Sequence, residues 1–258
     1  AMRKIVLAPC SPFSVTKELM RDSAILARKH GVRLHTHLAE TRDENDFCQQ
    51  MYGKRPLALM EECSLIGPDV FYAHGIHFND DELRLLAQTG TSIAHCPSSN
   101  MRLGSGICRV TEMLDSGITV GIAVDGSASN DSSDMLGEIR HALLLQRVGK
   151  GAKALTCGRA LAMATVNGAN MLNFGLVGRL QPGWAADIAV FDVDTIGYAG
   201  SQADPVASLL FCGYDHQTSH TIVNGHVVVD GKRLVGLDED ELARSARTVS
   251  ARLLSKAL

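Results

Sequence analysis

Histidine and aspartate residues follow four apolar runs of this sequence, each at the point where the run ends. These residues are His37, His74, His95 and Asp125. A single histidine after a strand is more often structural than functional. Imidazole nitrogen and carboxylate oxygen together are suitable ligands for a divalent transition metal. Three histidines and one aspartate at equivalent points therefore favour a metal site.

A further carboxylate, Glu40, lies three residues after the first of these histidines. Beside a metal that activates water, a carboxyl group can transfer protons to and from a reacting molecule. The set of residues is therefore suited to hydrolysis. The sequence lacks the HxE and PCxxC signature of the cytidine-deaminase type of zinc site, so the chemistry would need a different scaffold.

Short apolar runs alternate with helix-like segments over the first 147 residues or so, a pattern that predicts a parallel sheet with crossover helices. Five strands are expected, at Lys4–Ala8, Arg33–His37, Val70–Ala73, Ser92–His95 and Thr119–Val124. In a parallel β/α barrel the functional side chains lie where strands end. The histidines and the aspartate are thus expected to converge on one rim.

The helix boundaries carry their own signals. Thr16, Asn79 and Ser133-Asp134 precede helix-like segments as capping residues, and Gly31 and Gly90 occupy expected C-terminal caps. A further helix is expected at Gly158–Asn170.

The sequence pattern changes after that helix. Short β segments with turn signals are expected at Gly178–Asp192 and His220–Asp230, followed by a terminal helix at Asp238–Lys256. The predicted organisation is a partial barrel over 1–177, a β-rich portion over 178–236 and a C-terminal helix over 237–258.

Several motifs resemble those of the amidohydrolase superfamily. They are His-Leu-Ala-Glu-Thr at 37–41, Ala-His-Gly at 73–75, His-Cys-Pro-Ser-Ser-Asn at 95–100, Val-Asp-Gly-Ser-Ala-Ser-Asn at 124–130 and the segment 178–188. They occur in family order over nearly the whole chain. Within the superfamily, the sequence is most similar to the aminohydrolase branch of guanine, adenosine-homocysteine and chlorotriazine hydrolases, and in particular to 8-oxoguanine deaminases.

The resemblance implies a role for each of four residues. His37 corresponds to the metal-ligating histidine after barrel strand five, and Asp125 to the metal-ligating aspartate after strand eight. Glu40 corresponds to the acid that protonates a ring nitrogen of the substrate. His74 corresponds to the histidine that contacts the substrate or the attacking oxygen. The catalytic residues would thus be Glu40, His74 and Asp125, with one divalent metal, zinc or alternatively iron.

The substrate pocket is expected to include Cys10 and His95 beside Glu40 and His74. Asn100 and Arg102 are candidates for helping His95 to shape it. Relatives that act on nucleosides carry histidine at the position of Cys10, in a Pro-His-x-Pro context. A thiol is a poorer partner for a ribose, which favours a free base as substrate. The alternative, in which Cys10 only packs, stays open.

The resemblance implies hydrolytic deamination of a purine-like base. The most specific form of this expectation is the conversion of 8-oxoguanine to urate and ammonia. A hydrolase of chloro- or alkylamino-triazines, or another guanine- or adenosine-type deaminase, is the nearest alternative. A non-catalytic fragment or scaffold is the alternative from a different class.

The family's first metal motif, an HxH at the end of strand one, has no counterpart upstream of His37. His35-Thr36-His37 is itself an HxH, but the order of the later motifs favours strand five for His37. The expected fold is the C-terminal part of a (β/α)8 barrel, about strands four to eight, with part of a small β-sandwich. We therefore expect a piece of a longer chain, inactive and without useful metal affinity by itself.

Composition limits the other classes of protein. The net charge is −3 and no basic face is apparent, which argues against nucleic-acid binding. Seven cysteines without a CxxC pair fit reduced thiols. There is no apolar run of about 18 residues and no signal peptide, so a cytoplasmic protein without a membrane span is expected. The expected partner is a small heterocyclic substrate, and homo-oligomerisation is common in the family.

Overall fold

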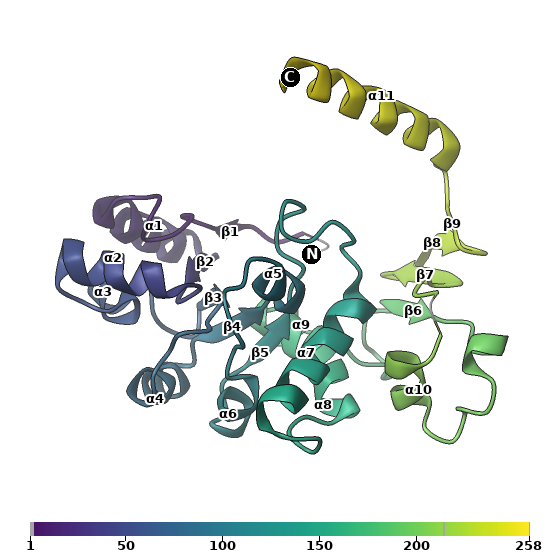
Figure 1. Ribbon diagram of the computed structural model, residues 1–258, viewed down its shortest axis with the longest axis horizontal. Coiled ribbons are helices and arrows are strands. Elements are labelled where there is room, and N and C mark those ends of the chain that lie inside the picture. The colour runs from purple at the N-terminus through teal and green to yellow at the C-terminus, as the bar shows by residue number, and fades with distance from the viewer. Residues whose placement is uncertain (1–2, 214, 258) are drawn as a thin grey trace.

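The computed structural model describes residues 3–213 and 215–257. Its first sheet contains five parallel strands in the order β1-β2-β3-β4-β5 (Figure 1). These strands are β1 (Val6–Leu7), β2 (Arg33–Leu38), β3 (Val70–His74), β4 (Ser92–His95) and β5 (Val120–Ile122). The predicted parallel α/β arrangement is confirmed. Over the described residues the sheet is open, because β1 and β5 lie at its two edges.

Alternation along β2 separates the two faces of this sheet. Leu34, Thr36 and Leu38 are buried, whereas His35 and His37 point to the opposite side and are half-buried. The register pairs His37 with Ala73 and Leu38 with His74, so β2 and β3 end together. The ends of neighbouring parallel strands thus place their polar residues along one edge.

Helices cover the face of the sheet to which Leu34 and Leu38 point. They are α1 (Lys17–His30), α2 (Arg42–Tyr52), α3 (Pro56–Glu62), α4 (Asp80–Thr89), α5 (Pro97–Arg102), α6 (Val110–Asp115) and α7 (Met135–Lys150). Leu34, Tyr72, Ile93 and Val120 of the strands belong to the main core cluster, together with apolar side chains of these helices.

The predicted caps of α1 and α4 are present. The Thr16 and Asn79 side chains accept hydrogen bonds from the first turns of α1 and α4, and Gly31 and Gly90 end these helices with φ of 61° and 71°. Asp134 is the N-cap of α7, but its carboxylate pairs with His216 instead of with the helix backbone.

The helix expected at Gly158–Asn170 is interrupted. It consists of α8 (Cys157–Ala162), a π-helical stretch (Met163–Asn167) and α9 (Gly168–Met171). Side-chain periodicity predicts the presence of a helix, but it does not record which carbonyl each amide reaches. Met171 of α9 packs with Phe71 and Ala94 on the face of the sheet that carries His37.

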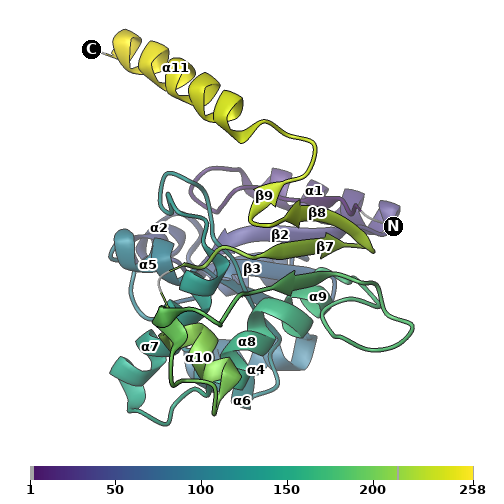
Figure 2. The same ribbon diagram turned by 90° about the vertical axis from the view of Figure 1, so that its right-hand side faces the viewer.

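A second sheet follows, antiparallel and four-stranded (Figure 2). Its strands are β6 (Ile188–Val190), β7 (His220–Val223), β8 (His226–Asp230) and β9 (Arg233–Leu234). Asn224 and Gly225 form the predicted turn between β7 and β8, both at positive φ. A short 3₁₀ turn (Ile196–Tyr198) and α10 (Pro205–Phe211) lie between β6 and β7.

The terminal helix, α11 (Glu239–Ala257), stands away from both sheets (Figures 1 and 2). No helix of the described residues has the length and apolarity that a bilayer crossing requires. The division into 1–177, 178–236 and 237–258 stays a prediction, and positions 1, 2, 214 and 258 of those ranges lie outside the described residues.

Candidate metal centre

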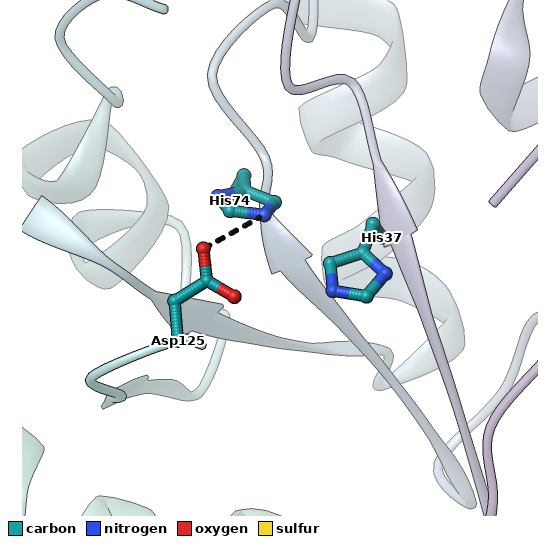
Figure 3. Close-up of side chains that lie close together, drawn as sticks. All are labelled: His37, His74 and Asp125. Atoms are coloured by element: carbon teal, nitrogen blue, oxygen red, sulfur yellow. Dashed lines mark ion pairs between the residues drawn. The ribbon is translucent and has the colours of Figure 1, made fainter. Parts of the chain in front are cut away.

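Three side chains from different strands meet at the carboxyl ends of the parallel strands (Figure 3). His37 is the next-to-last residue of β2, His74 ends β3 and Asp125 follows β5. One nitrogen or oxygen atom of each lies within 4.8 Å of the others. Over residues 3–213 and 215–257, this is the one group of three such residues close enough to hold a metal ion. The predicted convergence of His37, His74 and Asp125 is therefore observed.

A backbone carbonyl orients the His37 ring. The carbonyl oxygen of Cys10 lies 2.6 Å from Nδ1 of His37 and also accepts the His37 backbone N–H at 3.0 Å. Since a carbonyl only accepts, Nδ1 carries the proton. The lone pair then resides on Nε2, which is available to a metal.

His74 occupies its position through an unusual backbone conformation. Continued strand alternation would place it on the same face as Tyr72, towards the helices. Its φ of 71° lies in the left-handed region, and its ring lies 5.5 Å from that of His37. Nδ1 of His74 lies 2.9 Å from Oδ1 of Asn100. Because an amide oxygen only accepts hydrogen bonds, Nδ1 carries the proton. Its Nε2 lies 3.6 Å from Glu40 and 3.9 Å from Asp125.

Two hydroxyl groups hold the Asp125 carboxylate. Ser99 and Ser129 donate to its Oδ2 at 2.5 and 3.1 Å. Burial by itself would raise the pKa of Asp125, but the bonds from Ser99 and the Gly126 backbone lower it below its usual value. The carboxylate is therefore ionised at neutral pH, and Oδ1 remains for a cation or a proton.

The Glu40 side chain reaches the same cluster from the turn between β2 and α2. Its Oε2 faces Nε2 of His74, and its Oε1 lies 3.4 Å from the hydroxyl of Ser105. Glu40 is half-buried, whereas His74 is only 1% exposed. A carboxyl group in this place can exchange a proton with a molecule bound next to His74.

Comparison with known proteins agrees with this geometry. Residues 1–228 match the amidohydrolase family. The chain belongs to this family. The prediction of amidohydrolase membership, made from the strand-end motifs, is confirmed.

Individual members of the amidohydrolase family are similar along nearly the whole chain. It is 48% identical to 8-oxoguanine deaminase from Pseudomonas aeruginosa, over 98% of this chain and 56% of that protein. An adenosine deaminase from Xanthomonas campestris with bound zinc superposes with a TM-score of 0.93 at 29% identity, covering 96% of this chain and 57% of that one. A variant of atrazine chlorohydrolase from Arthrobacter aurescens, in complex with zinc and atraton, gives 0.90 at 33% identity, with 95% and 54% covered. The chain spans about half the length of the curated relatives it matches.

The second histidine of the His35-Thr36-His37 motif, and not the pair, joins the amidohydrolase cluster. His35 stacks on Phe71 with ring centroids 4.7 Å apart, and its Nδ1 lies 3.3 Å from the Phe71 carbonyl. Burial, and then the nearby His37, lower the pKa of His35 to about 4, so its ring is neutral. The geometry thus favours His37 alone as the ligand from β2.

The remaining predicted pocket residues differ in their burial and in their partners. His95 is fully buried, and neither ring nitrogen has a partner within the described residues. Burial lowers the pKa of His95 to about 3. Arg102 pairs with Asp131 at the surface. Cys10 contacts His37 through its carbonyl, and its thiol is exposed. Substrate contacts by His95 and Cys10 stay predictions.

Sequence reasoning missed three residues that support this amidohydrolase site. They are Ser99 and Ser129, which hold Asp125, and Glu44, which binds the backbone beside Glu40. For Glu44 a signal existed, because Thr41-x-x-Glu44 has the form of a capping box. For the serines no local pattern distinguishes them from Ser98 or Ser127.

The donor set fits a divalent transition metal. Imidazole nitrogen and carboxylate oxygen are common zinc ligands, and His37 and Asp125 provide one of each. The nitrogen and oxygen atoms of His37, His74 and Asp125 lie within 4.8 Å of one another. Each of the three donors already has a hydrogen-bonded partner that fixes its orientation.

Proposed function

We propose that this chain carries the acid–base residues and part of the metal site of a hydrolytic deaminase that converts 8-oxoguanine to urate and ammonia. The observation that carries the proposal is the cluster of His37, His74 and Asp125 with the Glu40 carboxylate 3.6 Å from His74. The 48% identity to the 8-oxoguanine deaminase of Pseudomonas aeruginosa supports this substrate.

His37 and Asp125 would hold the metal. The structures of two relatives contain zinc, which supports zinc as the metal here, and iron is the alternative. When bound, a divalent metal lowers the pKa of water towards neutrality and so makes water a nucleophile at physiological pH. Cys10 and the two serines keep His37 and Asp125 in their orientations.

The chain's own groups then move the protons. Asp125 accepts a proton from the attacking water, and His74 orients that water through Nε2. Glu40 donates a proton to the ring nitrogen next to the attacked carbon, so that charge does not accumulate on the ring. The ring carbon gains oxygen from water and loses its amino group, which leaves as ammonia.

We further propose that β1–β5 correspond to strands four to eight of the family's eight-stranded barrel. The chain covers 54% and 57% of the solved relatives, and its parallel sheet is open over the described residues. The remaining ligands would come from the missing strands, which is why the 258-residue chain is expected to bind metal weakly by itself.

A triazine hydrolase is the second candidate, because the atrazine chlorohydrolase superposes with a TM-score of 0.90. The same cluster would serve it with a different leaving group. A scaffold without catalysis is the third candidate, and it predicts no turnover under any condition.

The protein translated from the complete gene, loaded with zinc, tests these candidates. We expect ammonia release from 8-oxoguanine to exceed that from guanine and adenosine, and chloride release from a chlorotriazine to be absent. Glu40→Gln should lower kcat by about 10²–10⁴-fold, as expected for loss of a general acid. The exposed Glu18→Gln serves as the matched control. Chloride release without ammonia would favour the triazine hydrolase, and no turnover with zinc bound would favour the scaffold.

A further inference from the structure

Glu44 is a buried carboxylate to which the proposed reaction gives no role. It lies in the first turn of α2, three residues after the N-cap Thr41, and is 2% exposed. Burying a carboxylate is costly unless its oxygens are hydrogen-bonded. Its partners therefore indicate what the residue does.

Both partners of the Glu44 carboxylate belong to the turn that carries Glu40. Oε1 accepts the backbone N–H of Ala39 at 2.9 Å, and Oε2 accepts the backbone N–H of Glu40 at 2.9 Å. Ala39 has a φ of 54°, so the turn contains a non-glycine residue in the left-handed region. Two successive N–H groups beside such a residue can form a small anion-binding concavity. Here the concavity is filled by the chain's own carboxylate.

The same turn is tied to the segment after His74. The Ala39 carbonyl accepts N–H groups from Ile76 and His77, both at 2.9 Å, and the Leu38 carbonyl accepts that of Gly75 at 3.1 Å. Glu44 therefore accepts hydrogen bonds from the N–H groups of this turn. The carbonyl groups of the same turn accept hydrogen bonds from the residues that follow His74 at the end of β3. The relative position of Glu40 and His74 depends on this shared backbone.

The capping box of α4 shows the difference, although its glutamate, Glu82, also pairs with Arg55. In α4, Glu82 occupies the same third position of the helix and accepts the backbone N–H of its own N-cap, Asn79, at 2.8 Å. Glu44 reaches past its N-cap to the two preceding residues. Stabilising α2 would not require this longer reach.

We propose that Glu44 is a positioning residue that fixes the 39–40 turn and thereby holds the Glu40 carboxylate beside His74. The inference rests on the proposed function, in which Glu40 is the proton donor. Glu44 contacts neither the substrate nor the metal site. Its effect is therefore on proton transfer and not on the binding of either.

The variant Glu44→Gln preserves the size of the side chain but turns an NH₂ group towards one of the two N–H donors. In the complete zinc-loaded protein we expect kcat to fall about 10²-fold, as for a catalytic group displaced by about an ångström, with KM and zinc content unchanged. Glu82→Gln is the matched control, since it removes a capping carboxylate at the same helix position. It should lower the unfolding temperature and leave kcat intact.

A second measurement does not depend on turnover. In the 258-residue chain, backbone amide exchange at Ala39 and Glu40 should accelerate at least tenfold in Glu44→Gln, while that at Leu83 in α4 stays unchanged. Glu44→Asp, which retains the charge but is one methylene shorter, should bind one N–H only and give intermediate values of kcat and exchange.

The outcomes separate this inference from the proposed function. If Glu40→Gln abolishes turnover but Glu44→Gln retains full kcat, or only loses stability as Glu82→Gln does, the positioning role is wrong. Unchanged exchange at Ala39 and Glu40 would also overturn it. If Glu40→Gln retains full turnover, the proposed function itself fails.

Discussion

At the scale of single residues, the candidate site depends on three non-glycine residues with left-handed backbone. Ala39, His74 and Asp125 have φ of 54°, 71° and 65°. Such conformations cost on the order of 1 kcal/mol or more each and persist where surrounding contacts enforce them. The backbone N–H of Ala39 donates to Glu44, the His74 ring hydrogen-bonds the Asn100 amide oxygen, and the Asp125 carboxylate accepts from Ser99.

Removing the hydroxyl that holds Asp125 should weaken metal binding. We expect Ser99→Ala to reduce the zinc affinity of the complete protein by about 10–100-fold, the usual effect of losing a group that orients a ligand. Competition with a chromophoric chelator measures this affinity. Ser98→Ala is the control, because the neighbouring hydroxyl bonds His141 instead. Equal affinities for the two variants would contradict the orienting role of Ser99.

Glu44 also predicts a pH dependence of stability. Burial raises the pKa of its carboxyl from 4.5 to about 7, against the lowering effect of the Ala39 and Glu40 N–H groups. The stability that the neutral carboxyl contributes is therefore fully present below pH 4.5 and is lost as the pH rises through about 7. The free energy of unfolding of the wild type, relative to Glu44→Gln, should fall over this range. Urea titrations in pH steps measure it, and a difference that grows with pH would be inconsistent.

At the scale of elements, the parallel sheet packs against helices, and the π-helical stretch lies beside β5. Gly178, with φ of 90°, lies where a Cβ would come within 2.9 Å of the Val166 backbone in the π-helical stretch. The chain after α9 can therefore pass this stretch only because residue 178 has no side chain. The stretch in turn supports β5, since Asn167 donates to the Val120 carbonyl.

Adding a methyl group at this crossing should destabilise the protein. We expect Gly178→Ala to lower the free energy of unfolding by about 1–3 kcal/mol, through backbone displacement and left-handed strain. Gly175→Ala is the control, because a Cβ there would meet no described atom within 4 Å. Urea unfolding of the 258-residue chain compares the two variants, and similar losses would argue against the crossing as the cause.

At the scale of the whole molecule, α11 is separate from the two sheets (Figure 1). Leu242, Val249 and Leu253 are 56%, 42% and 61% exposed. A helix with so little burial contributes little to the hydrophobic stabilisation of the remaining chain.

Removing α11 should therefore leave the stability of the body unchanged. A chain that ends at residue 237 is expected to unfold within about 2 °C of the 258-residue chain, a shift that corresponds to less than about 1 kcal/mol. Differential scanning calorimetry at equal molar concentrations makes the comparison. A fall of more than about 5 °C would show that α11 packs on the body in solution.

The linear sequence was enough to predict the main elements and the side of the sheet at which the site forms. Short apolar runs placed β2, β3 and β4 to within one residue, and capping side chains marked the starts of α1 and α4. Because the carboxyl ends of parallel strands lie at the same side of a sheet, the positions of His37, His74 and Asp125 at the ends of three of its strands were sufficient to predict that they meet. These are local patterns, which a linear sequence records directly.

How these side chains are held became apparent from the folded chain. The left-handed turn of His74, the Cys10 carbonyl on His37 and the Ser99 hydroxyl on Asp125 depend on backbone conformation and on contacts between residues 26 or 27 positions apart. Many serines and carbonyls in the chain look alike in the sequence, and the fold selects the ones that come within hydrogen-bonding distance. The orientation of the donor atoms is thus a property of the packed sheet and its turns.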